Sequence, residues 1–210
     1  KTYKRLLFLL VSVFSFYLLI NIFEIEKKSI WLRENGIIET LSAVGYLVCA
    51  LLILYWGKIP FFKQYHYYLM MIVLFGLREL DFDKRFTTMG VFKSKFYLST
   101  EVPAIEKIIG LMVIAIVLYV LFSILKNHSK GFLANLKMLE PVYVGSFVVI
   151  MLLLISKTFD GFARKLRDFG VEISESASNN FSALEEVLEL AIPIALMITF
   201  YFYFSRQKAR

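Results

Sequence analysis

Long apolar segments separated by short charged ones constrain this chain more than any other feature of its sequence. A helix needs about 20 mainly apolar residues to cross the hydrocarbon core of a bilayer. Six segments approach this length: residues 6–23, 37–56, 60–80, 104–125, 141–160 and 183–204. Hydrophobic residues make up 59% of the 210 positions, which is more than a soluble domain of this size buries. The sequence therefore predicts an all-α, polytopic integral membrane protein, a bundle of six transmembrane helices.

Residues 1–210 are predicted to form a single transmembrane domain, because the sequence contains no repeat, linker or low-complexity tract. The third helix is the least regular. Its apolar run, residues 67–77, is short, so this helix spans only if it starts near Pro60 and continues into the charged segment that follows. The pattern Ser182-Ala-Leu-Glu185 is typical of a capping box and predicts the start of the sixth helix.

Lys and Arg are concentrated on one side of the predicted helices. With a cytoplasmic N-terminus, the segments 1–5, 57–66, 126–140 and 205–210 lie inside, and they hold eleven of the 24 basic residues. The remaining basic residues are spread over outer segments of about twice that total length. Because cytoplasmic loops are enriched in Lys and Arg, both termini are predicted to be cytoplasmic.

The acidic residues show the opposite distribution. Of the 17 Asp and Glu residues, only Glu140 falls on the cytoplasmic side of this topology. The net charge of +7 is therefore interpreted as a topology signal, and no nucleic-acid partner is expected. The single cysteine, Cys49, excludes a disulfide framework and a thiolate metal cluster.

Polar residues at several helix ends are predicted to converge on the outer half of the membrane, in a pocket open to the extracytoplasmic face. Ionisable groups at membrane depth are costly and usually face a bundle interior or a wet cavity. Glu189 is the sharpest candidate, since it lies two turns inside an apolar helix; a buried carboxylate paired with Arg78 or Lys157 is the structural alternative. The candidate acid–base residues are Glu39, Glu79, Asp83, Asp160 and Glu189, and the candidate substrate-binding cations are Arg78, Lys157 and Arg164.

The same acids could hold a metal ion. Oxygen ligands favour a hard divalent cation, Mg²⁺, Mn²⁺ or Ca²⁺, and the candidate ligands are Glu79, Asp83, Glu186 and Glu189. A zinc site built on histidine or cysteine is disfavoured, because His66 and His128, the only histidines, fall on the cytoplasmic side.

Three functional classes remain open from the sequence. A one-sided acidic pocket at headgroup level suits an enzyme that modifies a lipid or a lipid-linked substrate. An ion- or proton-coupled transporter or channel would need polar residues along a route to both sides, and the inner halves of the helices have few. The third class is a structural or receptor-like membrane subunit. The expected partners are the bilayer and a lipid headgroup or lipid-linked substrate, with the oligomeric state left open. In a prokaryote the membrane would be the inner, cytoplasmic one.

Overall fold

A computed structural model describes residues 2–22 and 36–208, and every secondary-structure element in these ranges is a helix. The chain divides into two compact units. The first unit contains Lys1–Gly45 and Leu133–Arg210, and the second contains Tyr46–Phe132. Within the described residues, four helices are long and apolar enough to cross a membrane: α3 (Ile37–Glu79), α6 (Ala104–His128), α8 (Pro141–Phe159) and α10 (Glu175–Lys208). The chain is thus an all-helical protein suited to a membrane.

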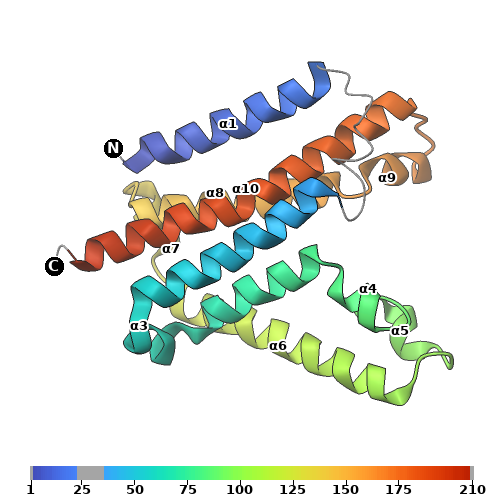
Figure 1. Ribbon diagram of the computed structural model, residues 1–210, viewed down its shortest axis with the longest axis horizontal. Helices are drawn as coiled ribbons and strands as arrows, with labels where there is room; N and C mark the ends of the chain where they lie inside the picture. The colour runs from blue at the N-terminus through green and yellow to red at the C-terminus, as the bar shows by residue number, and fades with distance from the viewer. Residues whose placement is uncertain (1, 23–35, 209–210) are drawn as a thin grey trace. The chain divides into compact units, whose positions relative to one another are not determined.

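In the first unit, α10 packs against both α8 and α1 (Thr2–Ile22), and the three helices run alongside one another (Figure 1). Small residues allow the α8 and α10 backbones to approach closely. Gly145 of α8 lies against Thr199, so that a Cβ on Gly145 would be only 2.4 Å from the threonine hydroxyl oxygen. At the far end of α8, Ser156 contacts Glu189. These two contacts show that α8 and α10 are antiparallel.

The helix α3 spans both predicted segments, 37–56 and 60–80, but it is not straight. The backbone at Lys58 (φ 52°, ψ −172°) and Tyr65 (φ −129°, ψ 28°) is not helical, and Pro60 lies between them. Within the second unit, Tyr46 packs on Phe75 with 5.8 Å between ring centroids. The part of α3 after Tyr65 therefore runs back beside the part before Lys58, as an antiparallel pair (Figure 1).

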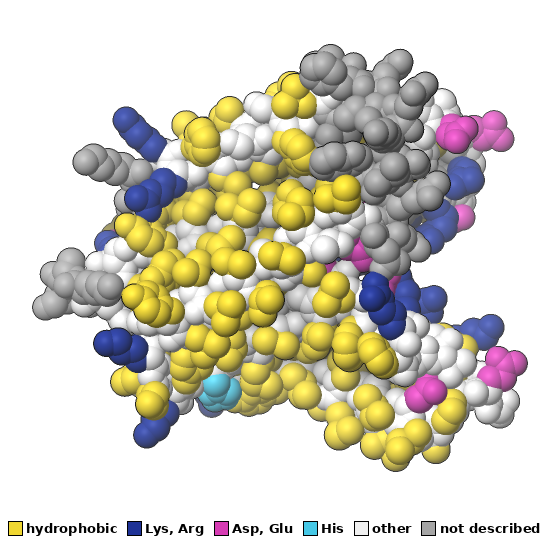
Figure 2. Space-filling view, viewed as in Figure 1, with side chains coloured by type: hydrophobic (Ala, Val, Ile, Leu, Met, Phe, Trp, Pro, Cys, Tyr) yellow, Lys and Arg dark blue, Asp and Glu magenta, His cyan; other side chains and the backbone are white. Residues whose placement is uncertain are grey.

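Short helices follow α3 in the second unit. They are α4 (Phe82–Phe86) and α5 (Ser94–Leu98), and α6 comes next. Two Tyr–His hydrogen bonds join the returning part of α3 to α6: His66 Nε2 with Tyr119 Oη (2.6 Å) and Tyr67 Oη with His128 Nε2 (2.7 Å). Much of the apolar surface of α6 remains exposed, and hydrophobic side chains cover the visible face of the helices (Figure 2). Lipid is the solvent that suits such a surface.

Several boundaries differ from the sequence prediction. The last helix begins at Glu175 rather than near residue 183, because Ser174 caps it: the Ser174 hydroxyl accepts a hydrogen bond from the Ala177 amide at 3.2 Å. Ser182 therefore lies inside α10, and its predicted role as a capping residue is wrong. Phe23, the last residue of the first predicted helix, lies outside the described residues. The number of spans, the single domain and the orientation stay predictions.

Candidate functional site

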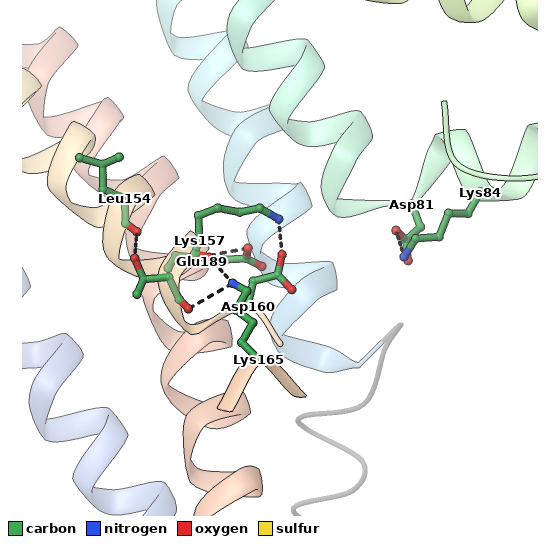
Figure 3. A network of polar contacts seen from close by, with 9 residues as sticks. Asp81, Lys84, Leu154, Lys157, Asp160, Lys165 and Glu189 are labelled. Carbon is green, nitrogen blue, oxygen red and sulfur yellow. Dashed lines mark hydrogen bonds and ion pairs between the residues drawn. The ribbon is translucent and has the colours of Figure 1, made fainter. Parts of the chain in front are cut away.

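The first unit contains a buried polar contact between α8 and α10. Ser156 Oγ donates a hydrogen bond to Glu189 Oε1 at 3.2 Å (Figure 3). Ser156 is 2% exposed and Glu189 is 9% exposed, so both groups are removed from solvent. The neighbours of Glu189 on α10 include Leu188 and Ile192, which are also buried. The candidate with the most apolar surroundings in the sequence is therefore a buried carboxylate with a hydroxyl partner.

Contacts of the first turns of α3 show which part of α10 lies beside Glu39. Ile38 packs in a cluster with Ala183 and Val187 of α10. Two turns further along α3, a Cβ on Gly45 would lie 2.9 Å from the Pro193 ring. Since α3 and α10 advance in the same direction between these contacts, Glu39 lies at the level of α10 that holds Glu189. Glu39 is half-buried.

A second polar group lies where α8 ends. Lys157 forms an ion pair with Asp160, with the lysine side chain 65% exposed and the aspartate 34% exposed (Figure 3). Gly161 adopts a left-handed conformation (φ 60°) that ends α8 and starts α9 (Phe162–Asp168). This turn lets Lys165 Nζ donate to the carbonyl oxygens of Lys157 (3.3 Å) and Thr158 (3.4 Å). The lysine thus satisfies carbonyl groups that the helix end leaves without intrahelical partners.

The turn between α8 and α9 also forms a groove of about 480 Å³. Its lining is mainly apolar and includes two lysines. The lining residues are Leu154, Lys157, Thr158, Phe162, Lys165, Leu166 and Phe169. An apolar groove with cations at its edge matches an amphiphile that carries an anionic group. Ser156 and Glu189 are not among the lining residues, so the groove and the buried carboxylate lie on different faces of α8.

Arg164 and Glu186 complete the candidates of the first unit. Arg164 is exposed on α9, and its guanidinium lies next to Gly161, where a Cβ would be 2.8 Å from Nη2. Glu186 is half-buried on α10, one turn before Glu189. The first unit therefore brings together, at one end, most of the polar residues that the sequence singled out.

The remaining candidates belong to the second unit. Glu79 is the last residue of α3 and is 6% exposed, whereas Arg78 is exposed. Asp83 is half-buried on α4, and its backbone oxygen accepts a hydrogen bond from the Thr87 amide at 3.1 Å. Asp81 forms an ion pair with Lys84 at 2.7 Å. Convergence of these residues with Glu39, Asp160 and Glu189 in one pocket stays a prediction.

Among residues 2–22 and 36–208, no three or more His, Cys, Asp and Glu side chains gather closely enough to hold a metal ion. A divalent cation at Glu79, Asp83, Glu186 and Glu189 stays a prediction.

Sequence reasoning did not single out Ser156 or Lys165. A hydroxyl four residues before Asp160, on an otherwise apolar helix, is a weak signal for the partner of a buried acid. Lys165 lies in a short amphipathic segment that ends at Gly170. The sequence of this segment does not indicate that the Lys165 side chain reaches back to α8. Both contacts depend on the tertiary arrangement.

The chain matches no protein-family model, no curated protein and no solved structure. A buried carboxylate that accepts a hydrogen bond can exchange a proton with a bound group, and the nearby cations can neutralise an anion.

Proposed function

We propose that this chain is an integral membrane enzyme that acts on a lipid or lipid-linked substrate at the extracytoplasmic face. In a prokaryote this would be the face of the inner membrane. The observation that carries the proposal is Glu189, a carboxylate 9% exposed inside a helix apolar enough to span a bilayer, with a hydroxyl partner 3.2 Å away. An acid at membrane depth is costly, and proteins retain such groups mainly where they bind protons, ions or substrate.

The acids supply proton transfer in this proposal. Glu189 is the general base, with Ser156 fixing the orientation of its carboxylate. Glu39, which lies at the level of α10 that holds Glu189, is the complementary acid. The proton goes from the attacking hydroxyl or water to Glu189, and the leaving group receives one from Glu39. The groove and Glu189 lie on different faces of α8, so the reacting part of the substrate must pass around this helix end.

The cations supply recognition of the headgroup. Lys157 and Lys165 line the groove, and Arg164 is exposed on the same helix as Lys165; these cations would neutralise a phosphate. Asp160 would hold Lys157 in place through their ion pair. The apolar lining, which includes Phe162, supports a substrate with a hydrocarbon part, because burial of apolar surface is favourable.

The same proposal has a metal-assisted form, in which a divalent cation takes part in the reaction. Mg²⁺, Mn²⁺ or Ca²⁺ would bind to carboxylates, with Glu186 and Glu189 as the candidates of the first unit and Glu79 and Asp83 as those of the second. Such a cation would polarise a phosphoryl or carbonyl oxygen. Chelation separates the two forms: EDTA abolishes turnover in the metal-assisted form and leaves it unchanged in the metal-free form.

The test uses purified protein in nanodiscs made from a total membrane lipid extract. Lipids are followed by mass spectrometry over time for species that appear or disappear with wild-type protein. Glu189→Gln keeps the size of the side chain and an acceptor for Ser156, so the protein is expected to fold, while turnover falls at least 100-fold. The matched control is Glu175→Gln, an exposed acid in the first turn of α10.

One result would overturn the enzyme proposal, and a second would overturn the role of Glu189 as general base. One is that wild-type protein changes no lipid in the extract. The other is that Glu189→Gln retains wild-type turnover while elution and unfolding temperature are unchanged. Aggregation of Glu189→Gln together with no lipid change by wild-type protein would favour the structural or receptor-like subunit.

Proton-coupled transport is the second candidate, and the burial of Glu189 favours it as well. A buried carboxylate in a largely apolar helix is a typical proton-binding group of transporters. Proteoliposomes with a pH-sensitive dye inside would report proton flux that Glu189→Gln abolishes. The inner half of α10 offers little to continue such a route, since Thr199 donates its hydroxyl to Ala195 O of its own helix at 2.7 Å.

A further inference from the structure

The second unit contains a buried hydroxyl group without a hydrogen-bond partner. Tyr97 Oη, on α5, is the only buried side-chain nitrogen or oxygen in this state among the residues that the structure describes. Such groups are rare in native proteins, because a buried donor that loses water and gains no acceptor costs free energy. The hydroxyl therefore points to an acceptor that the described residues do not supply.

The Tyr97 ring is held against α6 by tight packing. Phe96, which is fully buried, anchors α5 through a cluster with Val91 and Val102. Both aromatic rings lie over Gly110: a Cβ there would be 2.8 Å from Tyr97 Oη and 2.8 Å from Phe96 Cε1. Because Gly110 has no side chain, it leaves room for the hydroxyl end of Tyr97.

An apolar groove of about 350 Å³ extends from Tyr97 along α6. Its walls are Val91 and Phe92 on one side and Ile114 and Leu118 of α6 on the other. Gly110, Ile114 and Leu118 are spaced by four residues, so they share one face of the helix. The groove therefore continues the strip of α6 on which the hydroxyl lies, and its volume falls in the range of ligand-binding sites.

If α6 spans a membrane, Tyr97 lies near the boundary between headgroups and hydrocarbon. Gly110 is six residues into α6, about 9 Å from its start at 1.5 Å per residue. Tyrosine is enriched at this level of membranes, where an apolar ring can keep a polar tip near acceptors. Glycerophospholipids place their ester carbonyl groups at the same boundary.

We propose that this groove binds one acyl chain of a glycerophospholipid, whose ester carbonyl oxygen accepts a hydrogen bond from Tyr97 Oη. The hydroxyl gives up no protein hydrogen bond when it turns toward the lipid, so the movement costs only ring packing. The apolar walls take the chain, and the carbonyl satisfies the donor. This lipid site lies within the second unit and does not depend on the enzyme proposal.

The test compares two lipids that differ only in the acceptor. Detergent-purified protein is titrated with dioleoyl phosphatidylglycerol and with its diether analogue, and the first bound lipid is measured by native mass spectrometry. One neutral hydrogen bond predicts about fivefold tighter binding of the diester by wild-type protein. Tyr97→Phe is expected to bind both lipids equally, at the diether affinity.

Two further variants keep this test decisive. Tyr55→Phe is the matched control, because Tyr55 is 77% exposed on α3, and it should retain the fivefold preference. Ile114→Trp fills the groove and should weaken binding of both lipids at least tenfold. Tyr97→Phe should fold as well as wild type, since the hydroxyl it removes has no partner. Equal affinity of wild type for the two lipids, or a preference that survives in Tyr97→Phe, would overturn the proposal.

Discussion

The close approach of α8 and α10 at Gly145 makes a quantitative prediction about the substitution Gly145→Ala. The new Cβ would lie 2.4 Å from Thr199 Oγ1, 3.1 Å from its Cβ and 3.2 Å from its Cγ2. Rotation about χ1 would move the hydroxyl but not the Cβ, so the helices themselves must separate. Overpacking costs about 1–3 kcal/mol, and the better helix propensity of alanine returns up to about 1 kcal/mol. We expect a net loss of about 1–2 kcal/mol in the free energy of unfolding.

The assay is reversible unfolding in mixed micelles, followed by circular dichroism at 222 nm. The variant Thr199→Ala removes two of the three clashing atoms, so the double variant should recover most of the loss, with a coupling energy of about 1 kcal/mol. Gly76→Ala is the matched control, because its Cβ would meet only the Cβ of Tyr46 at 3.3 Å, and it should be nearly neutral. Wild-type stability of Gly145→Ala, or strictly additive effects in the double variant, would refute the proposed packing.

The same substitution reports on the site. Ser156 is eleven residues beyond Gly145, about three helical turns along α8. Displacement of α8 from α10 would lengthen its 3.2 Å hydrogen bond to Glu189. Any activity that depends on Glu189 should therefore fall in Gly145→Ala and return in the double variant with Thr199→Ala. If Gly145→Ala loses activity but keeps its stability, the contact at Gly145 and the hydrogen bond between Ser156 and Glu189 are not coupled through the register of these helices.

Three other predictions concern single contacts. Ser174→Ala should cost about 1 kcal/mol and speed hydrogen exchange at the Ala177 amide, whereas Ser174→Asp should not; equal exchange in all three proteins would contradict the cap. Gly161→Ala should destabilise the turn after α8 by about 1–2 kcal/mol, because φ there is 60°, and unchanged thermal unfolding would argue against this conformation. The ion pair between Glu140 and Arg206 is solvent-exposed, so a double-mutant cycle should give under about 1 kcal/mol; a coupling above 2 kcal/mol would show that the pair is shielded.

Most of the long helices were predictable because their apolar runs are long enough to decide their own structure. Pro141 is an example: it starts α8, where its missing amide costs nothing. The start of α10 was not predictable in the same way. Ser174 and Ser182 both precede residues that suit a first turn, and a local pattern cannot tell which of two serines caps when the residues between them also favour a helix. In α10 the helix extends to the earlier serine.

Local spacing also predicted only part of the candidate site. Lys157 and Asp160 are three residues apart, and the structure pairs them as helical geometry requires. Ser156 and Glu189 are thirty-three residues apart, and their contact follows from the register of two helices. That register is set by contacts such as the one between Gly145 and Thr199, in which a missing side chain is the informative feature. A sequence read one helix at a time does not show which partner fills the space above a glycine.

The same reasoning indicates where function can be sought in this protein. Burial of a polar group is costly unless a partner compensates it. Glu189 has Ser156 as a partner within the first unit, whereas the Tyr97 hydroxyl has none among the described residues of the chain. Removing the polar group therefore has opposite expected effects on the protein alone: Ser156→Ala should destabilise it, because the carboxylate loses a donor, while Tyr97→Phe should leave it equally or more stable. Unfolding temperatures in lipid-free detergent would distinguish a hydroxyl that serves the fold from one that serves a ligand.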